Sequence, residues 1–317
     1  MSTGFWTTVT TVTEKKSKVV SNVAPESTNS LRSEDDETKK KGDGHENLDY
    51  HVDVVIMTAV EDEYVAVRRV FQEIFSEEFA SGYKYSLANY EIPNYKKIIV
   101  AIFRQNSMGL VAASMTSTYA LNKFNPKLLL MCGVCAGIQG KAELGDLIVM
   151  SPVYNYGAGK FSAGRFFPDY QQRILDATVR PIIEQMVCDR DLARSIKDAW
   201  EHTLGKPSTE LAIHLYPGGS GAAVITDEVV IEEIKAHQRT LGAIDMESYA
   251  IAEVANAALA KEIPWLVVKG VQDFASPLKN DQYREYCAFC SGLFAKKFLE
   301  RYFVKYMPET PQTNDSQ

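Results

Sequence analysis

Between residues 52 and 271, short apolar runs alternate with stretches of helical periodicity. The apolar runs indicate strands, and several lack polar alternation, as strands buried on both faces do; they cover residues 52–59, 98–103, 128–132, 147–153, 211–216 and 265–271. The helical patterns cover residues 62–75, 108–123, 227–237, 247–261 and 281–303, with a helical insertion at 169–203. This interleaving predicts an α/β fold, a single-domain three-layer sandwich with a mixed central sheet flanked by helices.

The two ends of the chain differ from this pattern. Residues 1–50 are rich in Ser, Thr, Lys and Glu, and residues 34–46 are almost entirely charged. Such segments bury too little apolar area to offset the entropy of ordering, so residues 1–50 and 307–317 are predicted to be disordered tails. The folded domain is expected to span residues 51–306.

Composition excludes several classes of protein. The chain has 317 residues, of which 45% are hydrophobic, enough for one large core. A net charge of −7 argues against a nucleic-acid partner, because no basic surface would face the phosphates. No apolar run approaches the roughly 20 residues of a membrane helix, and the beginning of the chain lacks a secretory signal. A cytoplasmic location without membrane partners is expected.

Three carboxylates stand at junctions between predicted elements: Glu63, Glu247 and Asp273. In open α/β sheets ligands bind at the carboxyl ends of strands, so acids placed there face a site. Each also fits a structural role, Asp273 as a helix N-cap and both glutamates as first-turn residues that complement the helix dipole. Small residues at 132–137 and 218–223 allow the backbone to approach a flat ligand.

The order of these motifs resembles the purine nucleoside phosphorylase/uridine phosphorylase superfamily over residues 51–303. The motifs are Gly145-Asp-Leu-Ile-Val, Asp245-Met-Glu247 and Lys269-Gly-Val-Gln-Asp273-Phe-Ala. They are most similar to those of the hydrolytic branch, the methylthioadenosine/S-adenosylhomocysteine and AMP nucleosidases. The variant Cys132-Gly-Val-Cys-Ala-Gly-Ile resembles modules of immune effectors, some of which cleave ATP. The resemblance implies a nucleoside-phosphorylase-like domain that hydrolyses the N-glycosidic bond of a purine.

The same resemblance assigns roles to individual residues. Asp273 is the general acid that protonates the departing base, and a desolvated strand end favours its protonated form. Glu247 binds the ribose hydroxyls, Met246 packs under the ribose, and Glu63 activates the attacking water. The walls around the base are expected to comprise Val134, Cys135, Ala136, Ala223 and Val224.

Water is favoured over phosphate as the nucleophile, because the acidic segment Thr58-Ala-Val-Glu-Asp-Glu63 occupies the place of the family's phosphate-binding turn. Arg104, a further candidate for substrate binding, keeps phosphorolysis open. Cations in or near predicted site loops favour an ATP- or AMP-type adenine nucleotide over methylthioadenosine; they are Arg104, Lys160, Arg165, Lys279 and Arg284. In many nucleosidases an Asp follows the Ser-Gly pair, whereas here Ala222 follows Gly221. How the protein recognises adenine therefore stays open. A module that senses a nucleotide without turnover is a further alternative.

No metal or cofactor is expected. Two Cys-x-x-Cys pairs occur, Cys132/Cys135 and Cys287/Cys290, but structural zinc pairs usually lie closer in sequence. The His residues show no ligand spacing. The resemblance further implies a homo-oligomer, a dimer or a hexamer, in which a neighbouring subunit completes the site.

Overall fold

The structure is a computed structural model that describes residues 50–93, 95–258, 262–276 and 281–307. These residues belong to the second of two units into which the chain divides, Met1–Asn47 and Leu48–Gln317. The predicted tails lie almost wholly outside the described residues, as does Lys279. Their disorder and the domain limits at 51 and 306 therefore stay predictions.

The described residues form strands and helices in alternation. The strands are β1 (Val54–Thr58), β2 (Ile74–Ala80), β3 (Tyr83–Glu91), β4 (Lys97–Arg104), β5 (Leu128–Gly137), β6 (Leu147–Asn155), β7 (Gly159–Ser162), β8 (Arg165–Pro168), β9 (Gln172–Arg173), β10 (Ile213–Ser220), β11 (Ala243–Asp245) and β12 (Trp265–Asp273). The helices are α1 (Glu61–Val70), α2 (Leu110–Phe124), α3 (Arg180–Val187), α4 (Arg190–Asp198), α5 (Glu228–His237), α6 (Ser248–Asn256) and α7 (Arg284–Tyr306). None of these helices has the length and apolar content needed to cross a bilayer.

One mixed sheet organises the described residues. Its strand order is β11-β10-β6-β12-β5-β1-β4-β3-β2, with β9 added beside β6 and a further pairing between β11 and β5. At its centre β12, β5, β1 and β4 run parallel, whereas β6 is antiparallel to β12 and β3 is antiparallel to β4. The predicted mixed central sheet is confirmed. Four parallel strands place their carboxyl ends at one edge, where the candidate site lies.

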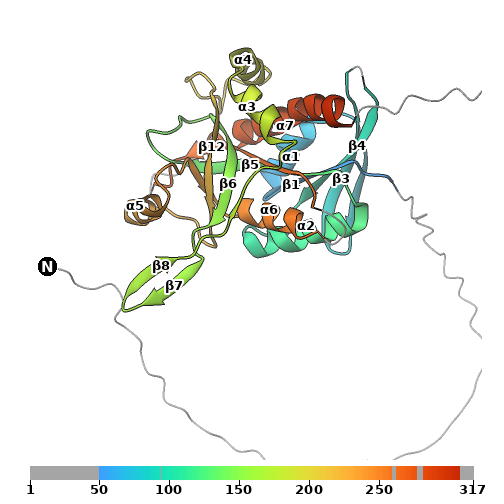
Figure 1. Ribbon diagram of the computed structural model, residues 1–317. Helices are drawn as coiled ribbons and strands as arrows, with labels where there is room; N and C mark the ends of the chain where they lie inside the picture. The colour runs from blue at the N-terminus through green and yellow to red at the C-terminus, as the bar shows by residue number, and fades with distance from the viewer. Residues whose placement is uncertain (1–49, 94, 259–261, 277–280, 308–317) are drawn as a thin grey trace, which may run out of the picture. The chain divides into compact units, whose positions relative to one another are not determined.

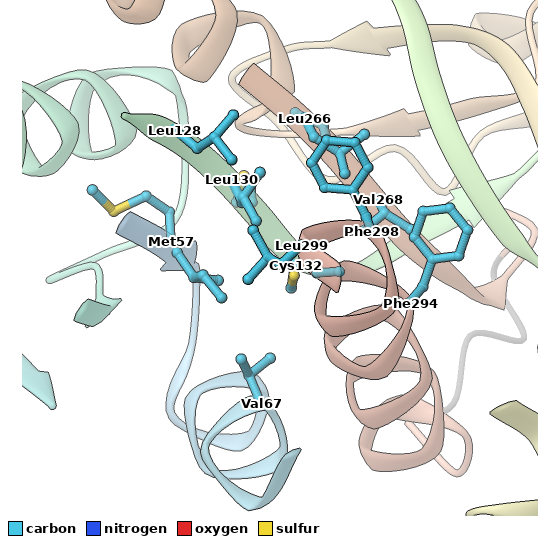
Figure 2. Packing of buried hydrophobic residues seen from close by; sticks show 14 of the residues in the cluster. Met57, Val67, Leu128, Leu130, Cys132, Leu266, Val268, Phe294, Phe298 and Leu299 are labelled. Carbon is cyan, nitrogen blue, oxygen red and sulfur yellow. The ribbon is translucent and has the colours of Figure 1, made fainter. Parts of the chain in front are cut away.

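Helices cover both faces of the sheet. Helix α2 packs beside α6 on one face, and α1 packs beside α7 on the other (Figure 1). Figure 2 shows residues of β5 and β12 beside α7; they include Leu130, Leu266 and Val268 on the strands and Phe294, Phe298 and Leu299 on the helix. Each of these side chains is fully buried, and burying one Leu or Phe contributes about 1.5–3 kcal/mol. Burial on both faces explains why these strands lack an alternation of polar and apolar residues.

The prediction of a helix over residues 62–75 is wrong at its C-terminal end. Helix α1 ends at Val70. Strand β2 begins at Ile74 and forms a hairpin with β3. Residues of β2 alternate between half-buried and exposed, the period of an edge strand. Ser81 and Gly82 make the turn with φ of 53° and 82°, and a Ser-Gly pair between alternating residues is the signal that identifies such a hairpin. Similarly, the helix predicted at 247–261 ends at Asn256.

Candidate active site

A pocket opens at the carboxyl ends of β1, β5 and β12. It contains about 660 Å³ of empty space, part of it open to solvent. All the predicted site residues except Arg104 line it; they are Glu63, Val134, Cys135, Ala136, Ala223, Val224, Met246, Glu247 and Asp273. Segments far apart in the sequence therefore meet where the sheet order predicts a ligand site.

Glu63 lies in the first turn of α1 and is only 2% exposed. Its Oε2 accepts hydrogen bonds from the backbone N–H groups of Ala59 (2.7 Å) and Val60 (3.3 Å), which satisfies amides at the start of the helix. Its Oε1 accepts a third bond, of 2.9 Å, from the N–H of Val134 on β5. Glu63 thus caps its own helix and is fixed against the pocket wall. The structural role of Glu63 is confirmed, and its role toward water stays a prediction.

Glu247 immediately precedes α6 and is 4% exposed. Its Oε1 accepts a 2.9 Å hydrogen bond from the N–H of Gly109, at the start of α2. Burial raises the pKa of Glu247 to about 7, with further upward contributions from the carboxylates of Asp245 and Glu63 and a downward one from Lys269.

Lys269 is a fully buried cation beside the pocket, and no role was predicted for it. Its Nζ lies 3.5 Å from Asp245 Oδ2 and 3.6 Å from Glu247 Oε2, and makes no hydrogen bond within the described residues. Burial alone would lower the pKa of Lys269, but the carboxylates of Glu63, Asp245 and Glu247 raise it above its usual value. A lone lysine inside an apolar strand run was the available signal, since an unpaired buried charge is costly.

Asp245 serves the architecture of the site. Its Oδ1 accepts a 2.8 Å hydrogen bond from Ser220 Oγ at the end of β10, and its Oδ2 accepts from the backbone and hydroxyl of Ser248 at the start of α6. These bonds tie β10, β11 and α6 together and so fix Glu247, two residues farther along the chain.

Asp273 ends β12 and is 8% exposed. Its Oδ1 accepts a 2.9 Å hydrogen bond from the N–H of Ala275, and its Oδ2 accepts a 3.0 Å bond from the Nε2 of Gln272. The first contact is a local turn of the kind an Asp side chain forms with the backbone two residues later. The second comes from a neighbour that also lines the pocket, so the carboxyl group is held on both oxygens.

The remaining lining residues are mostly apolar, and one of them carries an aromatic ring. Tyr156, just beyond β6, lines the pocket and was not predicted. A Cβ on Gly221 would overlap its ring, and its hydroxyl donates a 3.4 Å hydrogen bond to the carbonyl of Ala223. Burial, with a contribution from Asp245, raises the pKa of Tyr156 to about 12, so its hydroxyl stays protonated. No sequence motif marked this residue, because its place in the pocket depends on contacts with the distant residues 220–223.

The structure does not bring Arg104 to the pocket. Its Nη1 lies 3.0 Å from Glu61 Oε2 in the first turn of α1, where an acidic residue also interacts favourably with the helix dipole. Lys160 and Arg165 lie on the exposed β7–β8 ribbon and do not line the pocket either. Of the cations weighed from the sequence, Arg284 is the one among the described residues that does.

The cysteines of the two Cys-x-x-Cys pairs are buried and free. The Sγ of Cys135 donates to the carbonyl of Gly270 and that of Cys287 to the carbonyl of Val271, at 3.6 Å and 3.3 Å. Burial raises the pKa of both thiols, which keeps them protonated and poor as metal ligands. Among the described residues, no group of three or more His, Cys, Asp and Glu is placed to hold a metal ion.

Residues 53–297 match the sequence profile of the family described as the phosphorylase superfamily. The match covers most of the chain, and the protein belongs to this superfamily. The prediction made from its motifs is thereby confirmed.

Named relatives share the family at lower identity. ATP nucleosidase Cap17 of Escherichia coli is 25% identical over 217 residues, which are 65% of this chain and 42% of Cap17. The 5′-methylthioadenosine/S-adenosylhomocysteine nucleosidase of a Marinomonas species is 22% identical over 250 residues, 78% of this chain and 98% of that protein. The chain thus spans about half the length of some of its curated relatives.

Solved structures confirm the fold. The 5′-methylthioadenosine/S-adenosylhomocysteine nucleosidase of Neisseria meningitidis, solved with methylthio-immucillin-A, superposes with a TM-score of 0.60 at 15% identity. The superposition covers 78% of this chain and 98% of that one.

Proposed function

We propose that this protein hydrolyses the N-glycosidic bond of an adenine nucleoside or nucleotide and releases adenine. One observation carries the proposal: three buried carboxylates, Glu63, Glu247 and Asp273, meet in a single pocket above a buried lysine. Membership of the phosphorylase superfamily and the two nucleosidase relatives support it.

Each carboxylate has one task in the reaction. Asp273 gives its proton to an imidazole nitrogen of the base while the bond to the ribose breaks, and the electron pair of that bond leaves with the base. Glu247 accepts hydrogen bonds from the ribose hydroxyls, and its negative charge favours the cationic sugar of the transition state. Glu63 takes a proton from the water that adds to the sugar carbon. Asp273 ends ionised and Glu63 protonated, so one proton returns through solvent before the next turnover.

Charge in the pocket favours water over inorganic phosphate. Its lining carries the carboxylates of Glu63, Asp245, Glu247 and Asp273, and one described cation, Arg284. The Nη2 of Arg284 already donates a 2.6 Å hydrogen bond to Asp281. A phosphate dianion beside the sugar would face four carboxylates, whose nearby described cations are Arg284 and the buried Lys269.

Two candidates remain for the group at the 5′ position of the substrate. Similarity to Cap17 supports a nucleotide of the ATP or AMP type, and with it the role of a cytoplasmic immune effector that the motifs suggest. The pocket itself favours an uncharged group such as a methylthio ether, because Val60, Met108 and Val224 are apolar and the described lining offers no unpaired cation for phosphates.

Exposed apolar side chains support the proposed homo-oligomer. Val111 and Met115 on α2 are 74% and 59% exposed and adjoin Met108, which lines the pocket. A second copy covering this face would shield apolar area and lie next to the 5′ end of the substrate.

Chromatography of free base tests the proposal, after incubation with ATP, AMP, adenosine, methylthioadenosine or inosine, with and without phosphate. We expect adenine without added phosphate, and the fastest substrate identifies the 5′ group. Asp273→Asn is the matched control, since it keeps the side chain's shape and removes the acid. Release that depends on phosphate would make the protein a phosphorylase. Ligand binding without release would support the sensing module.

A further inference from the structure

A chain of hydrogen bonds runs from the start of α7 to the proposed acid. The Nε of Arg284 donates to Gln272 Oε1 at 3.3 Å, and the Nε2 of Gln272 donates to Asp273 Oδ2 at 3.0 Å. All three side chains line the pocket. Gln272 is 5% exposed, so its amide is held in a site where an unmade hydrogen bond would be costly.

An irregularity in β12 makes this contact possible. In a regular strand, neighbouring side chains point to opposite faces of the sheet. Here Val271 pairs with Cys135 and Asp273 with Ala136, so Gln272 is an extra residue on the β12 side of the ladder. Such bulges re-aim side chains, and this one brings residues 272 and 273 to the same pocket.

Arg284 determines which end of the amide faces the acid. A guanidinium group only donates hydrogen bonds, so the carbonyl oxygen of Gln272 must face Arg284 and the NH2 group must face Asp273. Arg284 is itself held by Asp281, at 2.6 Å, and its Nη1 lies 3.7 Å from Asp62 on α1. Without the guanidinium, the amide is free to rotate and present its oxygen to Asp273.

We propose that Gln272 and Arg284 are positioning residues for the general acid, a role that rests on the proposed function. The amide N–H fixes the plane of the Asp273 carboxyl group together with the Ala275 N–H, and both donors stabilise the carboxylate left after the proton has moved to the base. The pair therefore acts on the chemical step, through the readiness with which Asp273 releases its proton.

Gln272→Leu tests the donor, because leucine has a similar volume and no N–H. We expect kcat for base release to fall about 10- to 100-fold, as for loss of a hydrogen bond to a charged group, with KM changed less than threefold. In this variant the carboxylate of Asp273 loses a hydrogen-bond donor, so the acid keeps its proton to higher pH. The basic limb of the pH profile of kcat therefore shifts to higher pH. A structural role alone would leave that limb in place.

Arg284→Met tests the outer residue without touching the acid or its donor. We expect kcat for base release to fall in this variant too, by less than in Gln272→Leu. Arg284→Lys should recover part of the lost rate, because the ammonium group also donates to Gln272 Oε1. The control is Arg194→Met, which removes an arginine with a comparable i,i+3 partner, Asp191, on α4. Thermal melting of each variant separates loss of folding from loss of rate.

The outcomes are distinguishable. The positioning role alone would be overturned if the wild-type protein releases base and both variants behave like it. In that case Gln272→Leu and Arg284→Met would keep kcat within threefold of the wild type and leave the basic limb of the pH profile unchanged. Absence of base release by the wild-type protein would overturn the proposed function and this role with it. A Gln272→Leu/Asp273→Asn double variant no slower than Asp273→Asn alone is expected, since the amide acts only through the acid.

Discussion

Replacing Gly133 with alanine tests how the backbone holds Glu63. Gly133 has φ of 153°, and a Cβ built there would lie 2.6 Å from Cδ and 2.9 Å from Oε2 of Glu63. Carbon and oxygen atoms in contact need about 3.5 Å, so the carboxylate must move by roughly 1 Å. That movement lengthens the 2.9 Å bond from the Val134 N–H and the 2.7 Å bond from the Ala59 N–H beyond hydrogen-bond range.

The expected effect on rate is large. A 1 Å misplacement of a reacting group costs about 10²-fold, and complete loss of a general base costs up to about 10⁴-fold. We therefore expect kcat for base release by Gly133→Ala to fall between these limits, as measured by chromatography at saturating substrate. Stability should fall by about 1–3 kcal/mol from the strained backbone, as measured by chemical denaturation.

Gly140→Ala is the matched control. Gly140 also has a positive φ, of 78°, but no atom lies within 4 Å of the position of an added Cβ. It carries backbone strain without displacing Glu63, so it should lose stability and keep its rate. The double variant Gly133→Ala/Glu63→Gln should be no slower than Glu63→Gln alone. Equal rates for Gly133→Ala and the wild type, or additive losses in the double variant, would refute the reasoning.

Two further predictions concern the buried charges. Because folding raises the pKa of Glu247 from an ordinary 4.5 to about 7, the native state binds the extra proton, and the free energy of unfolding should decrease from pH 4.5 to 7 by roughly 3 kcal/mol from this group. Glu247→Gln should flatten that decrease in urea titrations across this range; an unchanged slope would contradict it. Lys269→Met should cost about 3–5 kcal/mol, because it leaves Asp245 and Glu247 without their buried cation. Lys235→Met, which removes an exposed pair with Glu232, should stay within about 1 kcal/mol, and equal losses in the two lysine variants would refute the prediction.

The site combines several acids with little positive charge, and this explains its reliance on backbone donors. Glu63 accepts three N–H bonds, Glu247 accepts one from Gly109, and Asp273 accepts one from Ala275. Backbone amides supply positive partial charge without a mobile side chain. They hold each of the three carboxylates in place in one pocket.

Much of the fold and of the candidate site could be predicted from the sequence. Strands buried on both faces are mostly apolar, so β1, β5, β6 and β12 were visible as apolar runs with few polar residues. Carboxylates at the ends of such runs pointed to Glu63 and Asp273, and both line the pocket. These features depend on residue type and local spacing, which the chain carries without reference to its folded form.

Tertiary structure alone decided the rest. Val134 donates to Glu63 across 71 positions of sequence, and Gly109 donates to Glu247 across 138. Lys269 gains its partners only when β11 and β12 are placed in one sheet, and Gln272 reaches Asp273 only because the ladder is irregular there. Arg104 was misplaced for the same reason, since its partner Glu61 lies on an element that packs against its strand. Local patterns record which face of an element is buried, whereas contacts between distant segments depend on register and packing, which local patterns do not encode.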